Sequence, residues 1–238
     1  MLREKKGIIM INIKDEIQDV LNKLVLPCVK DKFTNNINYE TFGKDVESPL
    51  IQELIKRLGE KGFKEFIIAP DKNAFPDLEI TDPHGTRYAI DIKSVNHSKR
   101  EKGKWGKQGS PGNDLGSFDK LKEVHTTYDP ENVFFAFVHY NYNDRCPGEV
   151  LNIELDNHYA FFGKNKDGFI KYRLGDGKVR PKTFKQKSFF EDAKQMLSML
   201  HRSEQHWSQQ LAKKAIARLD YSNKNELLTW MATGNETK

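Results

Sequence analysis

The sequence contains few cysteines, only Cys28 and Cys146 in 238 residues. They lie far apart in the chain and form no C-x-x-C pair, which is the spacing typical of zinc sites. A disulfide framework of the kind that stabilises small secreted proteins also needs more cysteines than these. This scarcity argues against zinc-binding and disulfide-rich classes and favours a reducing compartment, so we expect a cytoplasmic protein.

The sequence also lacks a long apolar run, an internal repeat and a low-complexity linker. Its first apolar stretch, residues 7–13 (GIIMINI), is interrupted at once by Lys14, Asp15 and Glu16. This stretch is too short to span a membrane, and no signal-peptide cleavage site follows it. We therefore expect a single domain over residues 1–238 with no membrane association.

What the sequence does contain is enough apolar material for a sizeable core. Hydrophobic residues make up 37% of the chain, and 15 of them are phenylalanines. That fraction argues against a disordered chain. The net charge of +5 and the isoelectric point near 8.9 permit nucleic-acid binding. Whether the charge serves that purpose depends on where the cations are placed.

Apolar periodicity predicts an α/β fold with a central mixed β-sheet flanked by helices. Helical spacing is expected at residues 15–24, 47–61, 115–125 and 188–220, the last as one helix or two. Strand patterns are expected at residues 63–69, from 77 onwards, and at 87–95, 133–140, 150–155 and 168–174.

The strand expected at residues 87–95 (RYAIDIKSV) carries the chemistry around which the chain is organised. Side chains alternate across a strand, so Asp91 and Lys93 share one face while Ile90 and Ile92 fill the other. A second carboxylate, Asp77, follows Pro76 at the start of the preceding strand. Burying an aspartate and a lysine among apolar residues is costly, and such pairs suggest a functional site.

Carboxylates on adjacent strands can share Mg²⁺, which takes oxygen ligands and keeps several waters. Such a metal ion lowers the pKa of a bound water and polarises a phosphoryl oxygen. Lys93 could orient that water or stabilise the transition state, and burial is expected to lower its pKa. Glu47, on the inward face of the helix at 47–61, could hold a second metal or act on the first through water. These residues predict phosphodiester hydrolysis with Asp77, Asp91 and Glu47 as metal ligands.

A Pro-Asp followed by Asp-x-Lys also arises by chance, and the sequence contains other segments that fit parts of this pattern. Asp71 follows Pro70, and Asp176 and Asp192 each precede a lysine by two residues. Asp71 leads into a polar loop, Asp176 lies in a glycine turn and Asp192 lies on an expected helix. The alternative for Asp91 and Lys93 is an edge-strand aspartate beside a solvated lysine.

The segments 75–77 (FPD) and 89–93 (AIDIK) resemble the catalytic stretch of type II restriction endonucleases of the PD-(D/E)xK nuclease superfamily, of the blunt-cutting EcoRV-like kind. The helix that begins with Glu47 is similar in position to the glutamate-bearing helix of that group. Residues 116–120, 134–143 and 178–187 resemble the SwaI-like blunt cutters. The resemblance implies a restriction-endonuclease-like fold and a Mg²⁺-dependent homodimer. It also implies that both strands of a short palindrome are cut, leaving 5′-phosphates.

Two basic stretches are the predicted DNA contacts. The loop after the catalytic strand is expected to hold phosphates through Lys99, Arg100, Lys102, Lys104 and Lys107. The segment 178–187 is expected to contact phosphates or read base edges through Lys178, Arg180, Lys182, Thr183, Lys185 and Gln186. The alternative for the first stretch is a solvated loop, and for the segment 178–187 base reading and simple phosphate contact both stay open.

We interpret the chain as a Mg²⁺-dependent, sequence-specific endonuclease of double-stranded DNA. Its helical part extends to about residue 46, its catalytic core spans about 47–174, and a basic DNA-contacting segment with C-terminal helices follows at 175–238. A repair or recombination nuclease that nicks mismatches or resolves junctions is the first alternative. A catalytically silent DNA-binding protein on the same fold is the second.

Overall fold

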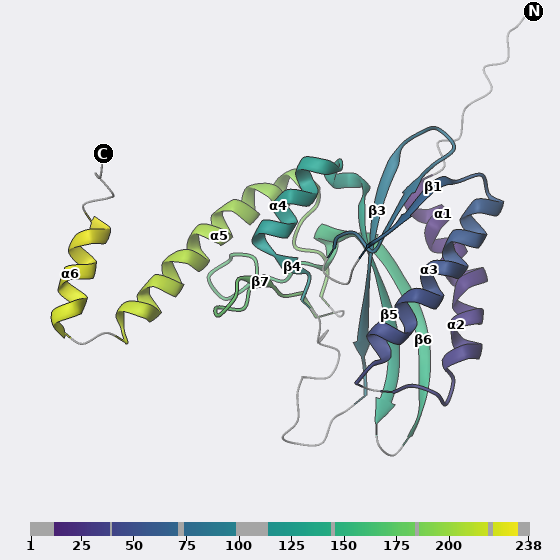
Figure 1. Ribbon diagram of the computed structural model, residues 1–238, viewed down its shortest axis with the longest axis horizontal. Coiled ribbons are helices and arrows are strands. Elements are labelled where there is room, and N and C mark those ends of the chain that lie inside the picture. The colour runs from purple at the N-terminus through teal and green to yellow at the C-terminus, as the bar shows by residue number, and fades with distance from the viewer. Residues whose placement is uncertain are drawn as a thin grey trace, which may run out of the picture.

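The fold is a five-stranded sheet with helices on both faces, as a computed structural model of the chain shows (Figure 1). The structure describes residues 12–38, 40–70, 74–98, 114–143, 146–183, 186–218 and 221–232. Within these ranges, no helix is long and apolar enough to cross a membrane.

The sheet has the strand order β1-β2-β3-β5-β6. Its strands are β1 (Lys64–Ile68), β2 (Leu78–Thr81), β3 (Arg87–Asn96), β5 (Val133–Asn143) and β6 (Cys146–Asn157). Strands β3 and β5 run parallel, and the other neighbours run antiparallel. The predicted central mixed sheet is therefore confirmed, and the strand that carries Asp91 and Lys93 lies in its middle.

One face of the sheet is covered by the N-terminal helices, which stand to one side of it in Figure 1. They are α1 (Ile13–Val20), α2 (Leu26–Phe33) and α3 (Phe42–Glu60). A π-helical turn, Leu21–Val25, joins α1 to α2, so the helix expected at 15–24 continues beyond Pro27. Proline interrupts the α-helical hydrogen-bond ladder, and the wider turn just before Pro27 lets the chain remain helical.

The other face carries α4 (Phe118–Thr127), α5 (Ala193–Ile216) and a small sheet of β4 (Gly116–Ser117) and β7 (Lys178–Val179). An aromatic core fills the space beneath them and includes Phe118, Phe135, Phe137, Phe161 and Phe162. Figure 1 shows α5 leaving the body of the molecule, with α6 (Tyr221–Ala232) at its far end.

The strand expected at 168–174 is wrong. This segment forms only isolated bridges, Lys164 with Ile170 and Tyr172 with Val179. Its backbone finds partners outside a sheet, since the Ile170 amide donates to the Ser203 hydroxyl of α5 at 2.9 Å. Alternating apolar residues favoured a strand, but a neighbouring strand is also needed to complete a ladder. The division of the chain into three parts stays a prediction.

Candidate active site

The hairpin of β2 and β3 sets the position of the first two site residues. Its turn is held by Asp82, whose Oδ1 accepts from the amides of His84 at 2.8 Å and Thr86 at 2.9 Å. Gly85 adopts a φ of +89°, which glycine tolerates without strain. These contacts fix the strand register, and the register decides which side chains lie opposite each other.

In that register Leu78 pairs with Ile90, which places Asp77 beside Asp91 at the point where β2 begins. Both carboxylates are buried, with 8% of Asp77 and 3% of Asp91 exposed. The Ile92 amide donates to Asp77 Oδ2 at 2.5 Å, beyond the last pair of the β2–β3 ladder. The structure thus brings together the two aspartates that the sequence predicts to share a metal.

Lys93 completes the cluster from the same strand. Its Nζ forms an ion pair with Asp91 Oδ2 and lies 5.9 Å from the centre of the Phe135 ring. Ile90 and Ile92 lie on the opposite face of the sheet, in the core that α1, α2 and α3 cover. The predicted alternation along this strand is confirmed, and Lys93 sits among the carboxylates rather than in solvent.

Glu47 reaches the cluster from α3. The helix packs closely on β3 at Gly43, where a Cβ atom would lie 2.9 Å from the Ser94 hydroxyl. Glu47 follows one turn later and is half-buried. Burial raises the pKa of Glu47, and the charge of Asp91 raises it further while Lys93 lowers it. Glu47 is therefore electrostatically part of the site, as its predicted inward position requires.

The cluster contains three carboxylates, Asp77, Asp91 and Glu47, but only one ammonium group, Lys93, and this imbalance shifts their pKa values. Burial, and then the charge of Asp91, raise the pKa of Asp77 to about 7, although Lys93 and the Ile92 amide oppose the shift. Burial lowers the pKa of Lys93, but the charges of Asp91, Asp77 and Glu47 outweigh it and raise that pKa overall. Burial therefore acts on the Lys93 pKa in the expected direction, but the several carboxylates around the ammonium group decide the net shift.

The donor set fits Mg²⁺. Asp91 Oδ2 is buried and makes no hydrogen bond of normal geometry, with Lys93 as its ion-pair partner. Among the described residues, no three His, Cys, Asp or Glu side chains could hold an ion by themselves. Asp77 and Asp91 would thus supply two oxygen ligands, with waters and a substrate phosphate supplying others. Direct ligation by Glu47 stays a prediction, and action through a water fits its position.

Glu47→Gln should slow cleavage about 10- to 100-fold, the loss typical of a partner that acts on a metal through its ligands or waters. Glu53→Gln on the same helix is the matched control and should leave the cleavage rate nearly unchanged. Glu53 accepts a hydrogen bond from Arg57 at 2.6 Å, so its loss affects the helix surface. Single-turnover cleavage rates at saturating Mg²⁺ compare the two. A larger effect at Glu53 would show that the wrong face of α3 had been assigned to the site.

The alternative Asp-x-Lys segments have structural roles in this fold. Asp176 is bound by Arg173, and the hydrogen bond from that guanidinium lowers the Asp176 pKa to about 2. Asp192 caps α5, accepting from the Gln195 amide at 2.8 Å. Asp71 lies outside the described residues. Of the described Asp-x-Lys pairs that the sequence offers, only Asp91 and Lys93 lie beside a second buried aspartate.

The predicted DNA contacts are placed only in part. Lys99, Arg100, Lys102, Lys104, Lys107 and Lys185 lie outside the described residues. Lys178, Thr183 and Gln186 are exposed, as a DNA contact requires.

Arg180, however, already lies against an acidic group, because its Nη1 donates to Asp114 Oδ1 at 2.5 Å. Burial lowers the pKa of Lys182, and the charges of Glu154 and Asp156 oppose that shift. Base reading by either residue stays a prediction, and for Arg180 it would require the contact with Asp114 to change.

Sequence reasoning missed a further buried carboxylate next to the site, Glu79, which Arg87 and Tyr128 bind. Glu79, 6% exposed, accepts from Arg87 at 3.0 and 2.6 Å and also from the Tyr128 hydroxyl. The guanidinium lies 5.4 Å from the centre of the Tyr128 ring. The contacts among Glu79, Arg87 and Tyr128 link β2 and β3 to the C-terminal end of α4. The period-2 pattern that placed Asp77 also puts Glu79 on the same face, which was the available signal.

No family model matches this chain, and no curated protein matches it. Among solved structures, the chain is similar to the NlaIV restriction endonuclease, with a TM-score of 0.53 and 18% sequence identity. The match covers 76% of each chain. The more specific PD-(D/E)xK and EcoRV-like relationships stay predictions. The likeness confirms the predicted architecture: this chain has a restriction-endonuclease-like fold.

Proposed function

We propose that the protein is a Mg²⁺-dependent, sequence-specific endonuclease that hydrolyses double-stranded DNA and leaves 5′-phosphates. The observation that carries this proposal is the buried Asp77–Asp91 pair with Lys93 in ion contact beside it. Two oxygen-ligand side chains and a fixed ammonium group are what metal-assisted attack of water on a phosphodiester requires. A restriction-endonuclease-like fold is consistent with that chemistry, although fold alone does not decide function.

In this proposal Asp77 and Asp91 would hold the Mg²⁺ that acts on the scissile phosphate. The bound metal would polarise the phosphoryl oxygen and lower the pKa of the attacking water. Lys93, whose ammonium group lies against Asp91, would orient the water and stabilise negative charge on the phosphate. The new bond joins the water oxygen to phosphorus, and the bond to the 3′ oxygen breaks. The attacking water releases a proton to solvent, and the departing 3′ oxygen takes one up to become a hydroxyl.

Cutting both strands of a palindrome needs two active sites related by a two-fold axis, because the two scissile phosphates are so related. The proposed site uses one Asp77–Asp91–Lys93 cluster per chain, so we propose a homodimer on the DNA. Each subunit would read one half-site through exposed residues of the segment 178–187, such as Thr183 and Gln186. Sedimentation of the DNA complex should give two chains per duplex, and a monomeric complex would contradict this arrangement.

Incubation of the protein with plasmid DNA and Mg²⁺ tests the proposal directly. We expect discrete fragments, and sequencing of their ends should give one short site and 5′-phosphates. Cleavage should stop when the metal is chelated and resume when Mg²⁺ is restored. Nicks confined to mismatched or branched DNA would instead identify a repair or recombination nuclease. Binding without any cleavage would identify a catalytically silent DNA-binding protein.

A further inference from the structure

A groove lies between α4 and the loop that leads into Asp77. It has a volume of about 300 Å³, at the lower end of the range for ligand sites, about 300–1,000 Å³. Its walls combine an aromatic ring, a carboxylate, an ammonium group and a hydroxyl. They are formed by Ala74, Phe75, Lys120, Glu123, Val124, Thr127 and Tyr128.

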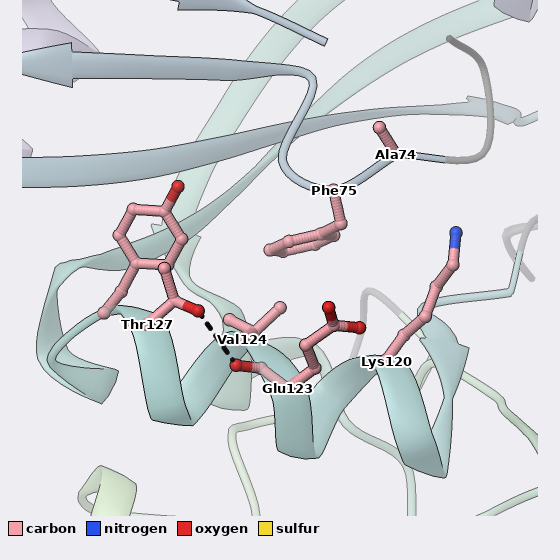
Figure 2. A pocket seen from close by; sticks show the side chains of 7 residues that line it. Ala74, Phe75, Lys120, Glu123, Val124 and Thr127 are labelled. Atoms are coloured by element: carbon pink, nitrogen blue, oxygen red, sulfur yellow. Dashed lines mark hydrogen bonds between the residues drawn. The ribbon is translucent and has the colours of Figure 1, made fainter. Parts of the chain in front are cut away.

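The arrangement of the polar groups is visible in Figure 2. The half-buried Phe75 ring lies over α4, and Lys120 and Glu123 project from the helix on the side that faces Ala74 and Phe75. The Thr127 hydroxyl donates to the backbone oxygen of Glu123 at 3.2 Å, which leaves the Glu123 carboxylate out of this contact. The groove thus offers a flat apolar surface with a hydrogen-bond acceptor near its edge.

The groove also adjoins the candidate active site. Phe75 is separated from Asp77 only by Pro76, and its ring meets the Phe135 ring edge-on at a centroid distance of 6.3 Å. Lys93 lies over that same Phe135 ring. Phe75 also packs against a small cluster that contains Val124 of α4 and Ala89 of β3. Phe75 therefore forms the boundary between the Asp77–Asp91–Lys93 cluster and the groove.

We propose that this groove receives one nucleobase, unstacked from the DNA next to the bond that is cut. The inference rests on the proposed function and adds a subsite to it. A base inside an intact duplex offers only its edges in the grooves, so its flat face can meet Phe75 only after it leaves the stack. Aromatic side chains bind unstacked bases by stacking, whatever the sequence.

The polar groups define which bases suit the groove. A carboxylate accepts hydrogen bonds from amino groups, as acidic side chains do from the N4 amine of cytosine. Glu123 therefore favours bases with an exocyclic amine (cytosine, adenine or guanine) over thymine. Lys120, at the end of the groove, is placed to attract the phosphate of the same nucleotide.

A double-mutant cycle between the protein and the DNA tests this. Duplexes spanning the mapped cut are made with each nucleotide near it replaced, one at a time, by an abasic sugar. Affinities are measured in the presence of Mg²⁺ with the Lys93→Ala chain, which retains the proposed metal ligands, and with the same chain carrying Phe75→Leu. At one position the two changes should be coupled by about tenfold, because each removes the same stacking contact. At the other positions the coupling factor should be close to one.

Three further variants complete the test. Phe189→Leu is the matched control, since Phe189 is also a half-buried phenylalanine but lies against Lys164 outside the groove. It should show no coupling at any position. Glu123→Gln, at an exposed site that tolerates the change, should reduce the preference for an amino-bearing base over thymine at the coupled position. Glu149→Gln, exposed on β6, should not.

Coupling factors near one at every position for Phe75→Leu, with no change in base preference for Glu123→Gln, would overturn the inference. If the unaltered protein still cleaves DNA in that case, only the groove inference is contradicted and the proposed function is not. Failure of the unaltered protein to cleave any DNA would defeat the proposed function instead, whatever the groove binds. If Phe75→Leu does not fold, as judged by circular dichroism, Glu123→Gln decides instead: a lost preference for an amino-bearing base at one position next to the cut supports the inference, and unchanged preferences at every position overturn it.

Discussion

Replacing Asp91 with alanine is expected to abolish DNA cleavage while the protein stays folded. The loss should reach at least about 10²–10³-fold, the effect of removing one electrostatic partner from a catalytic site. Asp91 is central in three ways: it would bind the metal, it forms the ion pair with Lys93, and its charge contributes to the raised pKa of Asp77. Asp91→Asn, which keeps the shape but removes the charge, should fail to cleave as well.

The fold should survive because the change relieves repulsion. Removing one carboxylate lowers the charge density around Asp77, and the unfolding midpoint without Mg²⁺ should not fall strongly. Plasmid cleavage and urea unfolding, measured on the same preparation, separate the two effects. Asp71→Ala is the control for the choice of Pro-Asp segment and should be nearly silent. Near-normal cleavage by the Asp91 variants would contradict the assignment of Asp91 as a metal ligand.

The second large effect is expected on stability in acid, through the buried His158 and the half-buried His125. His158 Nδ1 lies 3.2 Å from the Val133 carbonyl oxygen and His158 Nε2 lies 3.3 Å from His125 Nε2. A carbonyl only accepts, so neutral His158 carries its proton on Nδ1 and accepts from His125. Burial lowers the pKa of His158 to about 3 and that of His125 to about 4. Both rings are therefore neutral in the folded protein at neutral pH.

The sign of the pH dependence follows from these shifts. The unfolded chain protonates both histidines below pH about 6.5, whereas the folded chain does so only near pH 4 and 3. The unfolded state therefore binds more protons in this window, and the free energy of unfolding falls as the pH falls. At pH 5 the loss should be about 2 kcal/mol for each histidine relative to pH 7.5.

Urea unfolding of the unaltered protein and of the double variant His125→Gln/His158→Gln, at pH 7.5 and pH 5, measures this loss. The variant is destabilised at pH 7.5 by altered packing, but it should lose clearly less stability than the unaltered protein between the two pH values. His201→Gln, at an exposed position on α5, is the control and should keep the full loss. Equal losses in the double variant and the unaltered protein would show that other groups cause the acid sensitivity.

Local pattern was enough to predict the centre of the site. The strand period put Asp91 and Lys93 on one face and Ile90 and Ile92 on the other, and both placements are confirmed. The helical period directed Glu47 inward in the same way. Each of these predictions depends on neighbours within a few residues, where backbone geometry fixes the direction of a side chain.

The same reasoning failed where a segment needed a distant partner. Residues 168–174 alternate like a strand, but Ser203 of α5 takes up the Ile170 amide and no continuous ladder forms. The cations at 178–187 suggested free DNA contacts, yet Arg180 pairs with Asp114, which lies far away in the sequence. A charge run gives no information about which acids will face it after folding.

The sequence by itself therefore determined the fold class, the strand at the centre of the candidate site and the residue types on it. Hydrophobic periodicity and alternation act over a few residues, so they can be read from one chain. Only the tertiary structure decided that Asp77 lies beside Asp91, that His125 meets His158, and that Phe75 closes a groove against α4. These contacts join segments separated along the chain, and strand register and helix packing set them through the whole core.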